Sequence, residues 1–94
     1  MYSGMLINKT DPKDNSNIKK RIFFIIGGMD KIEVENRLIR LLNKSKLLDL
    51  KDIMYKYNGV ELNITTQQIP KFVRLFTENN IDIYGIYEIY NPKI

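Results

Sequence analysis

The dipeptide Asn58-Gly59, which lies between two runs of alternating apolar and polar residues, constrains the fold more than any other feature of this sequence. Alternation is typical of half-buried strands, and Asn-Gly can supply the two positive-φ residues of a type I′ turn. If Tyr57 pairs with Val60, one face of the resulting hairpin is apolar. On the other face, Lys56 then lies opposite Glu61. The apolar face consists of Ile53, Tyr55, Tyr57, Val60, Leu62 and Ile64.

A strand and a helix are expected before this hairpin. Residues 21–26 are apolar on both faces and stop at Gly27-Gly28, which is typical of a central strand. Asp30 stands three residues before Glu33, a pair that can cap the free N–H groups of a helix's first turn. We expect this helix to end near residues 43–45. Its apolar stripe has helical spacing and comprises Val34, Leu38, Leu41 and Leu42, flanked by Ile39.

A second helix and a last strand are expected after the hairpin. Thr65 or Thr66 can cap the helix, and Pro70 then falls in its first turn, where a missing N–H costs little. The apolar stripe of this helix comprises Ile69, Phe72, Val73 and Phe76. Asn79-Asn80 tolerates the left-handed conformation of a helix end, and residues 81–90 alternate as a strand.

The order of these elements is β-α-β-β-α-β, and it predicts the fold class. With right-handed crossovers it yields an α+β, ferredoxin-like two-layer sandwich, in which a four-stranded antiparallel sheet of order 4-1-3-2 carries both helices on one face. Ninety-four residues suffice for one domain, which we assign to residues 19–94.

Residues 1–18 are predicted to form a flexible polar N-terminal tail. Their many Ser, Asn, Asp and Thr residues bury too little apolar area to offset the entropy of ordering. The alternative is that residues 5–7 add a short edge strand.

The composition excludes most enzyme chemistry. Without histidine or cysteine, the chain has no Ser-His or Cys-His nucleophile pair, no thiol redox centre and no zinc finger. The pairs Asp11 with Asp14 and Asp49 with Asp52 offer too few oxygens for a hard cation. We therefore expect no catalytic residue, no bound metal and no cofactor.

Charge and hydropathy bear on the cellular location of the protein. The net charge of +4 is spread along the chain. The longest apolar run, residues 22–29, is far shorter than the ~18 residues of a membrane span. We expect a cytoplasmic protein without an integral membrane segment.

The sheet face opposite the helices is expected to be apolar and to bind a protein partner or a second copy of the chain. Alternation would place Ile81, Ile83, Tyr87 and Ile89 on the helix side of the last strand. Strand one would add either Ile22, Phe24 and Ile26 or Phe23 and Ile25. The interface candidates are Met54, Tyr84, Ile86 and Tyr90. Cover by the N-terminal tail is the alternative.

Two further features are candidate sites. Gly27 and Gly28, before a helix, could form an anion-binding loop, although Asp30 favours a simple turn. Arg37, Arg40 and Lys44 form a basic set on the first helix, which favours a solvated face.

Residues 22–25 resemble the first RNA-contacting strand of an RNA-recognition motif. That module also needs outward aromatic residues on its third strand, where this chain has Glu61, Asn63 and Thr65. We therefore do not expect nucleic-acid binding, which remains an alternative function.

Residues 69–89, a helix followed by Asn-Asn and an alternating strand, resemble the end of the accessory domain of ATP-binding subunits of bacterial ABC exporters. The sequence lacks a Walker A loop, and residues 91–94 differ from the Ser-Leu-Glu-Asp-x-Phe type of segment found there. The resemblance implies a small non-catalytic interaction or regulatory module, associated with a transporter.

Two other families are similar in topology. Residues 28–34 resemble the first loop of heavy-metal-associated domains, but Lys31 and Val34 replace its cysteines, so metal binding does not transfer. Gly27 and Gly28 resemble the glycine after the first strand of ACT domains. This resemblance implies an alternative function, an amino-acid-sensing regulatory domain.

Overall fold

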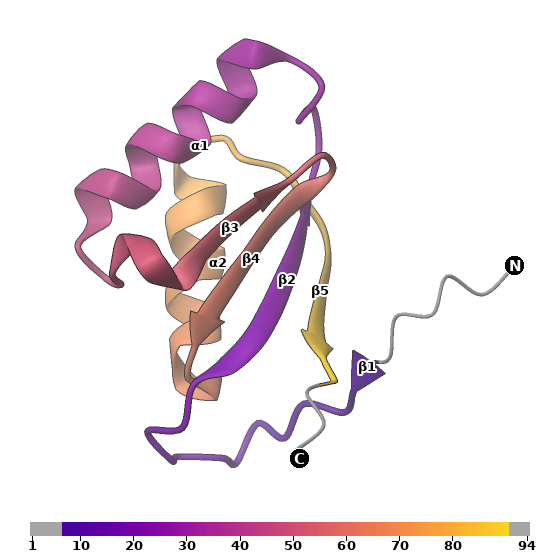
Figure 1. The fold of residues 1–94 in the computed structure, drawn as a ribbon, viewed down its shortest axis with the longest axis vertical. Coiled ribbons are helices and arrows are strands. Elements are labelled where there is room, and N and C mark those ends of the chain that lie inside the picture. The colour runs from indigo at the N-terminus through magenta and orange to yellow at the C-terminus, as the bar shows by residue number, and fades with distance from the viewer. Residues whose placement is uncertain (1–6, 91–94) are drawn as a thin grey trace, which may run out of the picture.

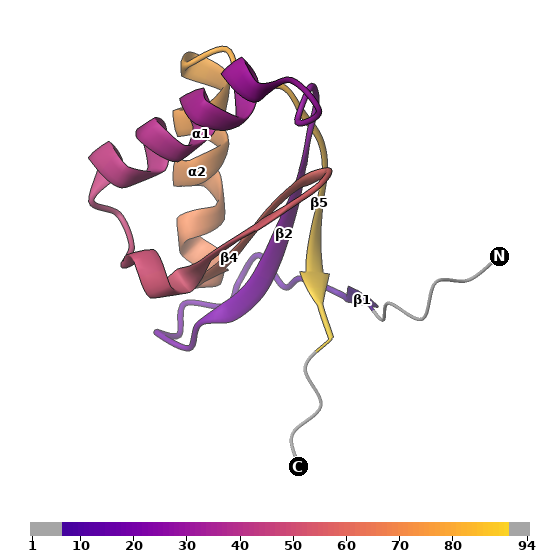
Figure 2. The same ribbon diagram turned by 45° about the horizontal axis from the view of Figure 1, so that its top comes forward.

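A computed structural model describes residues 7–90 and has one antiparallel sheet with both helices on one of its faces (Figures 1 and 2). The strand order is β1-β5-β2-β4-β3. Without β1 this is the order 4-1-3-2, and the ferredoxin-like fold is confirmed. The elements are β1 (Ile7–Asn8), β2 (Lys20–Ile26), α1 (Ile32–Ser45), the 3₁₀ turn η1 (Leu50–Asp52), β3 (Ile53–Lys56), β4 (Gly59–Ile64), the 3₁₀ turn η2 (Thr66–Gln68), α2 (Ile69–Glu78) and β5 (Ile83–Ile89).

The core lies between the sheet and the two helices. Alternate residues of β2, namely Ile22, Phe24 and Ile26, point into it. The rings of Phe24 and Phe76 meet edge to face, with 5.3 Å between their centroids. Because neighbouring side chains of a strand point to opposite faces, Phe23 and the remaining odd-numbered residues of β2 face away from the helices. The other buried members of the core are Met29, Leu38, Leu42, Val60, Leu62, Ile64, Phe72 and Ile81.

The start of α1 differs from the prediction. The turn after β2 extends through residue 30, with Gly28 at φ 79°. The Lys31 N–H donates to the Gly28 carbonyl at 2.9 Å, so the N-cap is Lys31. The predicted Asp30 cap is therefore wrong, because this tight turn moves the helix start one residue further along the chain.

The start of α2 agrees with the prediction. The Thr65 N–H donates to Oε1 of Gln68 at 2.9 Å, which caps η2, and α2 continues directly from it. Pro70 lies in the first turn of α2. After the helix, Asn80 adopts φ 60°, as expected of a residue that ends a helix.

The hairpin forms, but its turn lies one residue earlier than predicted. Lys56 pairs with Gly59, and Tyr57 and Asn58 form the turn, so the predicted pairing of Tyr57 with Val60 is wrong. Neither Asn58 nor Gly59 has a positive φ. A pairing shifted by two positions leaves the side chains of the strands on their predicted faces, so the remaining apolar residues still face the core, namely Ile53, Tyr55, Val60, Leu62 and Ile64. Two finer expectations are wrong, because Tyr57 lies in the turn and is 89% exposed, and Met54 rather than Lys56 pairs with Glu61.

Gly59 is required by close packing between strands. A β-carbon added there would lie 2.0 Å from the carbonyl oxygen of Phe24 on β2. A backbone atom cannot move aside as a side chain can, so any larger residue must push β2 and β4 apart.

The described part of the N-terminal segment has defined contacts. β1 pairs with the outer edge of β5, Ile7 with Ile89, whereas residues 5 and 6 lie outside the described residues. Nε2 of Gln67 donates to the carbonyls of Pro12 and Asp14, each at 2.9 Å. Residues 10–14 therefore lie against η2 and the start of α2 rather than over the open face of the sheet.

We predict that Gly59→Ala lowers the free energy of unfolding by about 1–3 kcal/mol, measured by urea denaturation, because the added methyl meets the Phe24 carbonyl. Gly85→Ala is the matched control. The atoms nearest to a β-carbon there belong to the ring of Tyr87, at 2.9 Å, and because Tyr87 is 36% exposed the ring can rotate away. We expect this control to stay within about 0.5 kcal/mol of wild type. Equal losses in the two variants would contradict the steric explanation.

Candidate functional site

The sheet surface opposite the helices, which we call the open face, is the candidate functional site. Cross-strand partners in an antiparallel sheet point to the same side. Phe23 pairs with Glu61 on β4 and with Tyr87 on β5, and Glu61 pairs in turn with Met54 on β3. The open face therefore carries Arg21, Phe23 and Ile25 of β2, Glu61 and Asn63 of β4, Met54 and Lys56 of β3, and Tyr87 and Ile89 of β5.

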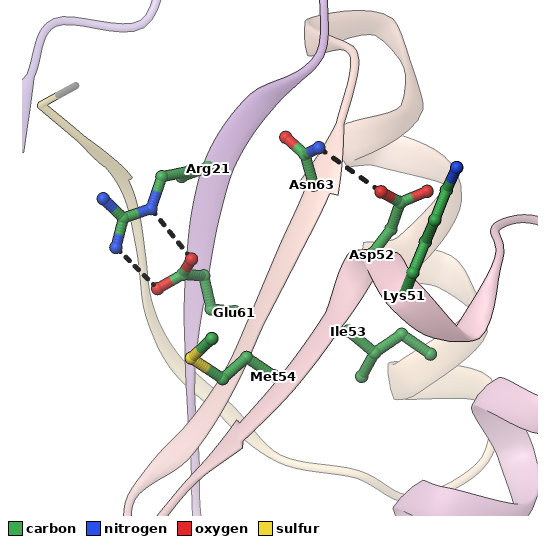
Figure 3. Close-up of a pocket in the computed structure, with 7 residues that line it drawn as sticks. All are labelled: Arg21, Lys51, Asp52, Ile53, Met54, Glu61 and Asn63. Carbon is green, nitrogen blue, oxygen red and sulfur yellow. Dashed lines mark hydrogen bonds and ion pairs between the residues drawn. The ribbon is translucent and has the colours of Figure 1, made fainter. Parts of the chain in front are cut away.

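A bidentate ion pair lies at the centre of the open face. Nε and Nη2 of Arg21 donate to the two carboxylate oxygens of Glu61, at 2.9 and 3.2 Å (Figure 3). Glu61 is only 9% exposed, and its hydrogen bonds raise the pKa of Arg21. A carboxylate buried to this extent needs a cation, and the guanidinium matches it with two parallel bonds.

A second buried carboxylate, Asp52, lies beside this pair at the end of η1. Nζ of Lys19 donates to it at 2.9 Å and Nδ2 of Asn63 at 3.3 Å. The hydrogen bond from Lys19, assisted by that from Asn63, holds the pKa of Asp52 below its usual value although burial opposes this. The same hydrogen bond raises the pKa of Lys19. Asp52 therefore carries its negative charge at neutral pH, and the ammonium group of Lys19 balances that charge.

Two shallow hollows flank the central ion pair, and Arg21 and Glu61 line both of them. The first has a volume of about 290 Å³ and includes Met54 and Lys51 (Figure 3). The second has a volume of about 440 Å³. Its other lining residues are Phe23, Lys56, Tyr57, Asn58 and Ile89. Each hollow thus combines apolar side chains with one lysine.

Met54 occupies the predicted position, on the open face and 52% exposed. Ile86 does not, because its partner on β2 is Phe24, whose side chain points into the core. The expectation that Ile86 lies on the open face is therefore wrong, and so is the assignment of Tyr87 and Ile89 to the helix side.

A β-bulge explains this exchange of faces. Ile26 pairs with Ile83 but Ile25 pairs with Gly85, so Tyr84 is an extra residue on β5. One inserted residue reverses which positions of the strand face the helices. The side chain of Tyr84 lies across Gly27 and is 74% exposed, and Tyr90 follows the end of β5, 41% exposed. A simple alternation pattern carries no signal for this insertion.

The glycine loop is occupied by backbone hydrogen bonds. The Gly27 N–H donates to the Asp82 carbonyl at 2.9 Å, and the Gly28 carbonyl accepts from Lys31. The first bond joins Gly27 to the residue before β5 and the second closes the strand-to-helix turn, so the Gly27 N–H is not available to an anion.

One residue of the basic set on α1 makes a structural hydrogen bond, and the other two face the solvent. Nη1 of Arg37 donates to the Asn80 carbonyl at 3.1 Å and links α1 to the turn after α2. Arg40 and Lys44 are exposed.

Sequence reasoning did not find Phe23, Tyr87 and Ile89 as a set, nor the ion pair of Arg21 with Glu61. The available signal was the alternation of β2, which left two faces open as candidates. Only the pairing of β2 with β4 brings Arg21 beside Glu61, 40 residues apart in the chain.

Within residues 7–90, no three carboxylate, histidine or cysteine side chains gather where they could hold a metal ion. None of the helices among these residues is long and apolar enough to cross a membrane. Comparison with protein families, with curated proteins and with solved structures found no significant match to this chain.

We predict that Asp52→Asn destabilises the protein most at neutral pH. The folded-state pKa of Asp52 is depressed, so its stabilising contribution is fully present above the unfolded value of about 3.9 and is lost as pH falls through the folded pKa. The difference in urea midpoint between wild type and variant should shrink below about pH 4. Asp30→Asn, which removes from the turn before α1 an exposed carboxylate that makes no ion pair with any described residue, is the control and should change the midpoint less. A pH-independent difference for Asp52→Asn would count against the ion pair.

Proposed function

We propose that this protein is a small non-catalytic interaction module that binds another protein chain through the open face. The observation that carries the proposal is the exposed apolar surface there. Met54 is 52% exposed and Tyr87 36% exposed, on a sheet face that neither helix covers. Apolar and aromatic side chains gathered on such a surface are typical of protein interfaces.

Other features support a binding role. The two hollows are open and shallow, which suits a protein surface better than a small ligand, since ligand sites enclose most of what they bind. The resemblance of residues 69–89 to ABC exporter accessory domains agrees with a module of this kind, and it implies an association with a transporter. An amino-acid sensor has less support, because the Gly27 N–H is already bonded.

We predict that a photo-crosslinking residue at position 54, introduced into the full chain in its native cells, forms a specific adduct. The same residue at position 40, on the exposed surface of α1, is the matched control and should form none. An adduct of twice the chain's mass would identify a second copy, and any other mass a different protein. No adduct at position 54, or the same adducts at both positions, would contradict the proposal.

A further inference from the structure

The carboxylates of the open face are neutralised within the protein. Glu61 is held at 2.9 Å by Nε of Arg21, and Asp52 is held at 2.9 Å by Nζ of Lys19. Both residues are buried, Asp52 being 8% exposed and Glu61 9%. Their negative charge therefore adds little to the field that an approaching protein meets.

Two lysines of the same surface make no ion pair within the described residues, although the charge of Lys51 helps to lower the pKa of the neighbouring Asp52, which Lys19 already pairs. Lys51 lines the first hollow and Lys56 the second, and both are exposed. No carboxylate of the described residues lies within ion-pair distance of either ammonium group. Met54 shares the first hollow with Lys51 and the open side of β3 with Lys56. An exposed apolar side chain thus lies between two unpaired cations.

We propose that the segment bound on the open face is acidic, with an apolar side chain placed on Met54 and carboxylates that reach Lys51 and Lys56. This inference rests on the proposed function and adds the chemistry of the partner. Complementary charge at the edge of an apolar contact steers association and selects among partners. Burial of the partner's apolar side chain against Met54 would add affinity through the hydrophobic effect.

A second copy of the chain fits this surface less well. In a two-fold arrangement the same surface meets itself, so Lys51 and Lys56 would face another positive surface. Single-stranded nucleic acid also fits less well. Successive bases need a row of exposed rings to stack on. On the open face Phe23 is only 6% exposed and Tyr87 36% exposed, and the ion pair of Arg21 with Glu61 occupies the centre of the sheet.

The test is a titration of the full chain, followed by amide NMR shifts, with a blocked ten-residue peptide of alternating glutamate and leucine. We expect saturable shifts for residues 51–56 and for Phe23. A matched peptide with glutamine in place of glutamate should bind more weakly. Lys51→Gln with Lys56→Gln should weaken binding of the acidic peptide about fivefold, as expected for two exposed charge contacts. The matched control, Arg40→Gln with Lys71→Gln, removes the same charge from the exposed surfaces of α1 and α2 and should leave binding unchanged.

Several results would overturn the inference. These are equal binding of the two peptides, equal weakening by the two double variants, no saturable shifts, or tighter binding of a twelve-nucleotide oligouridine. Dimerisation through the open face, detected by sedimentation and abolished by Met54→Lys, would assign the surface to a second copy. If position 54 crosslinks to another protein but the acidic peptide does not bind, the interaction module stands and the chemistry proposed for its partner is wrong.

Discussion

Packing around Phe24, at the centre of β2, is the constraint on which the rest of the structure depends. Its ring is completely buried and contacts Phe76 edge to face, which attaches α2 to the sheet. Its carbonyl oxygen lies 2.0 Å from the position that a β-carbon of residue 59 would take, so glycine at that position lets β4 approach β2 closely. Its cross-strand partners are Val60 and Ile86. One residue thus specifies the contact between the layers and the spacing within the sheet, because the interior is close-packed and leaves no room for adjustment.

The open face shows how a two-layer fold accommodates charge on a surface that is partly buried. Glu61 and Asp52 are both buried. Each is held by a cation that lies far from it in the sequence, Arg21 being 40 residues from Glu61 and Lys19 33 residues from Asp52. Such pairs contribute little net stability compared with apolar residues, but the loss of one partner leaves a costly buried charge. The sheet can therefore present apolar side chains and lysines outward while its carboxylates remain neutralised.

The bulge at Tyr84 determines which side chains reach the open face. Before it, Ile83 packs against the core, and after it Tyr87 and Ile89 lie on the opposite side of the sheet. The insertion places Tyr84 across Gly27, the first residue of the turn between β2 and α1, where glycine leaves room for the ring. A local irregularity of one residue thereby changes the composition of the entire β5 surface.

The sequence by itself determined the elements, their order and the two apolar helix stripes, because these follow from local periodicity and from residues with strong backbone preferences. Pro70, Asn80 and the Thr65 cap all act within a few residues of their own positions. The hairpin was also predictable, but the predicted turn lay one residue too late. Gly59 is needed for close packing against Phe24, 35 positions earlier in the chain, and not for the turn itself. Only the tertiary structure decided the facing of β5, the partner of Glu61 and the burial of Asp52. Each of these depends on the register of the strands and on contacts between residues far apart in the sequence. The alternation pattern of a single strand contains no information about either.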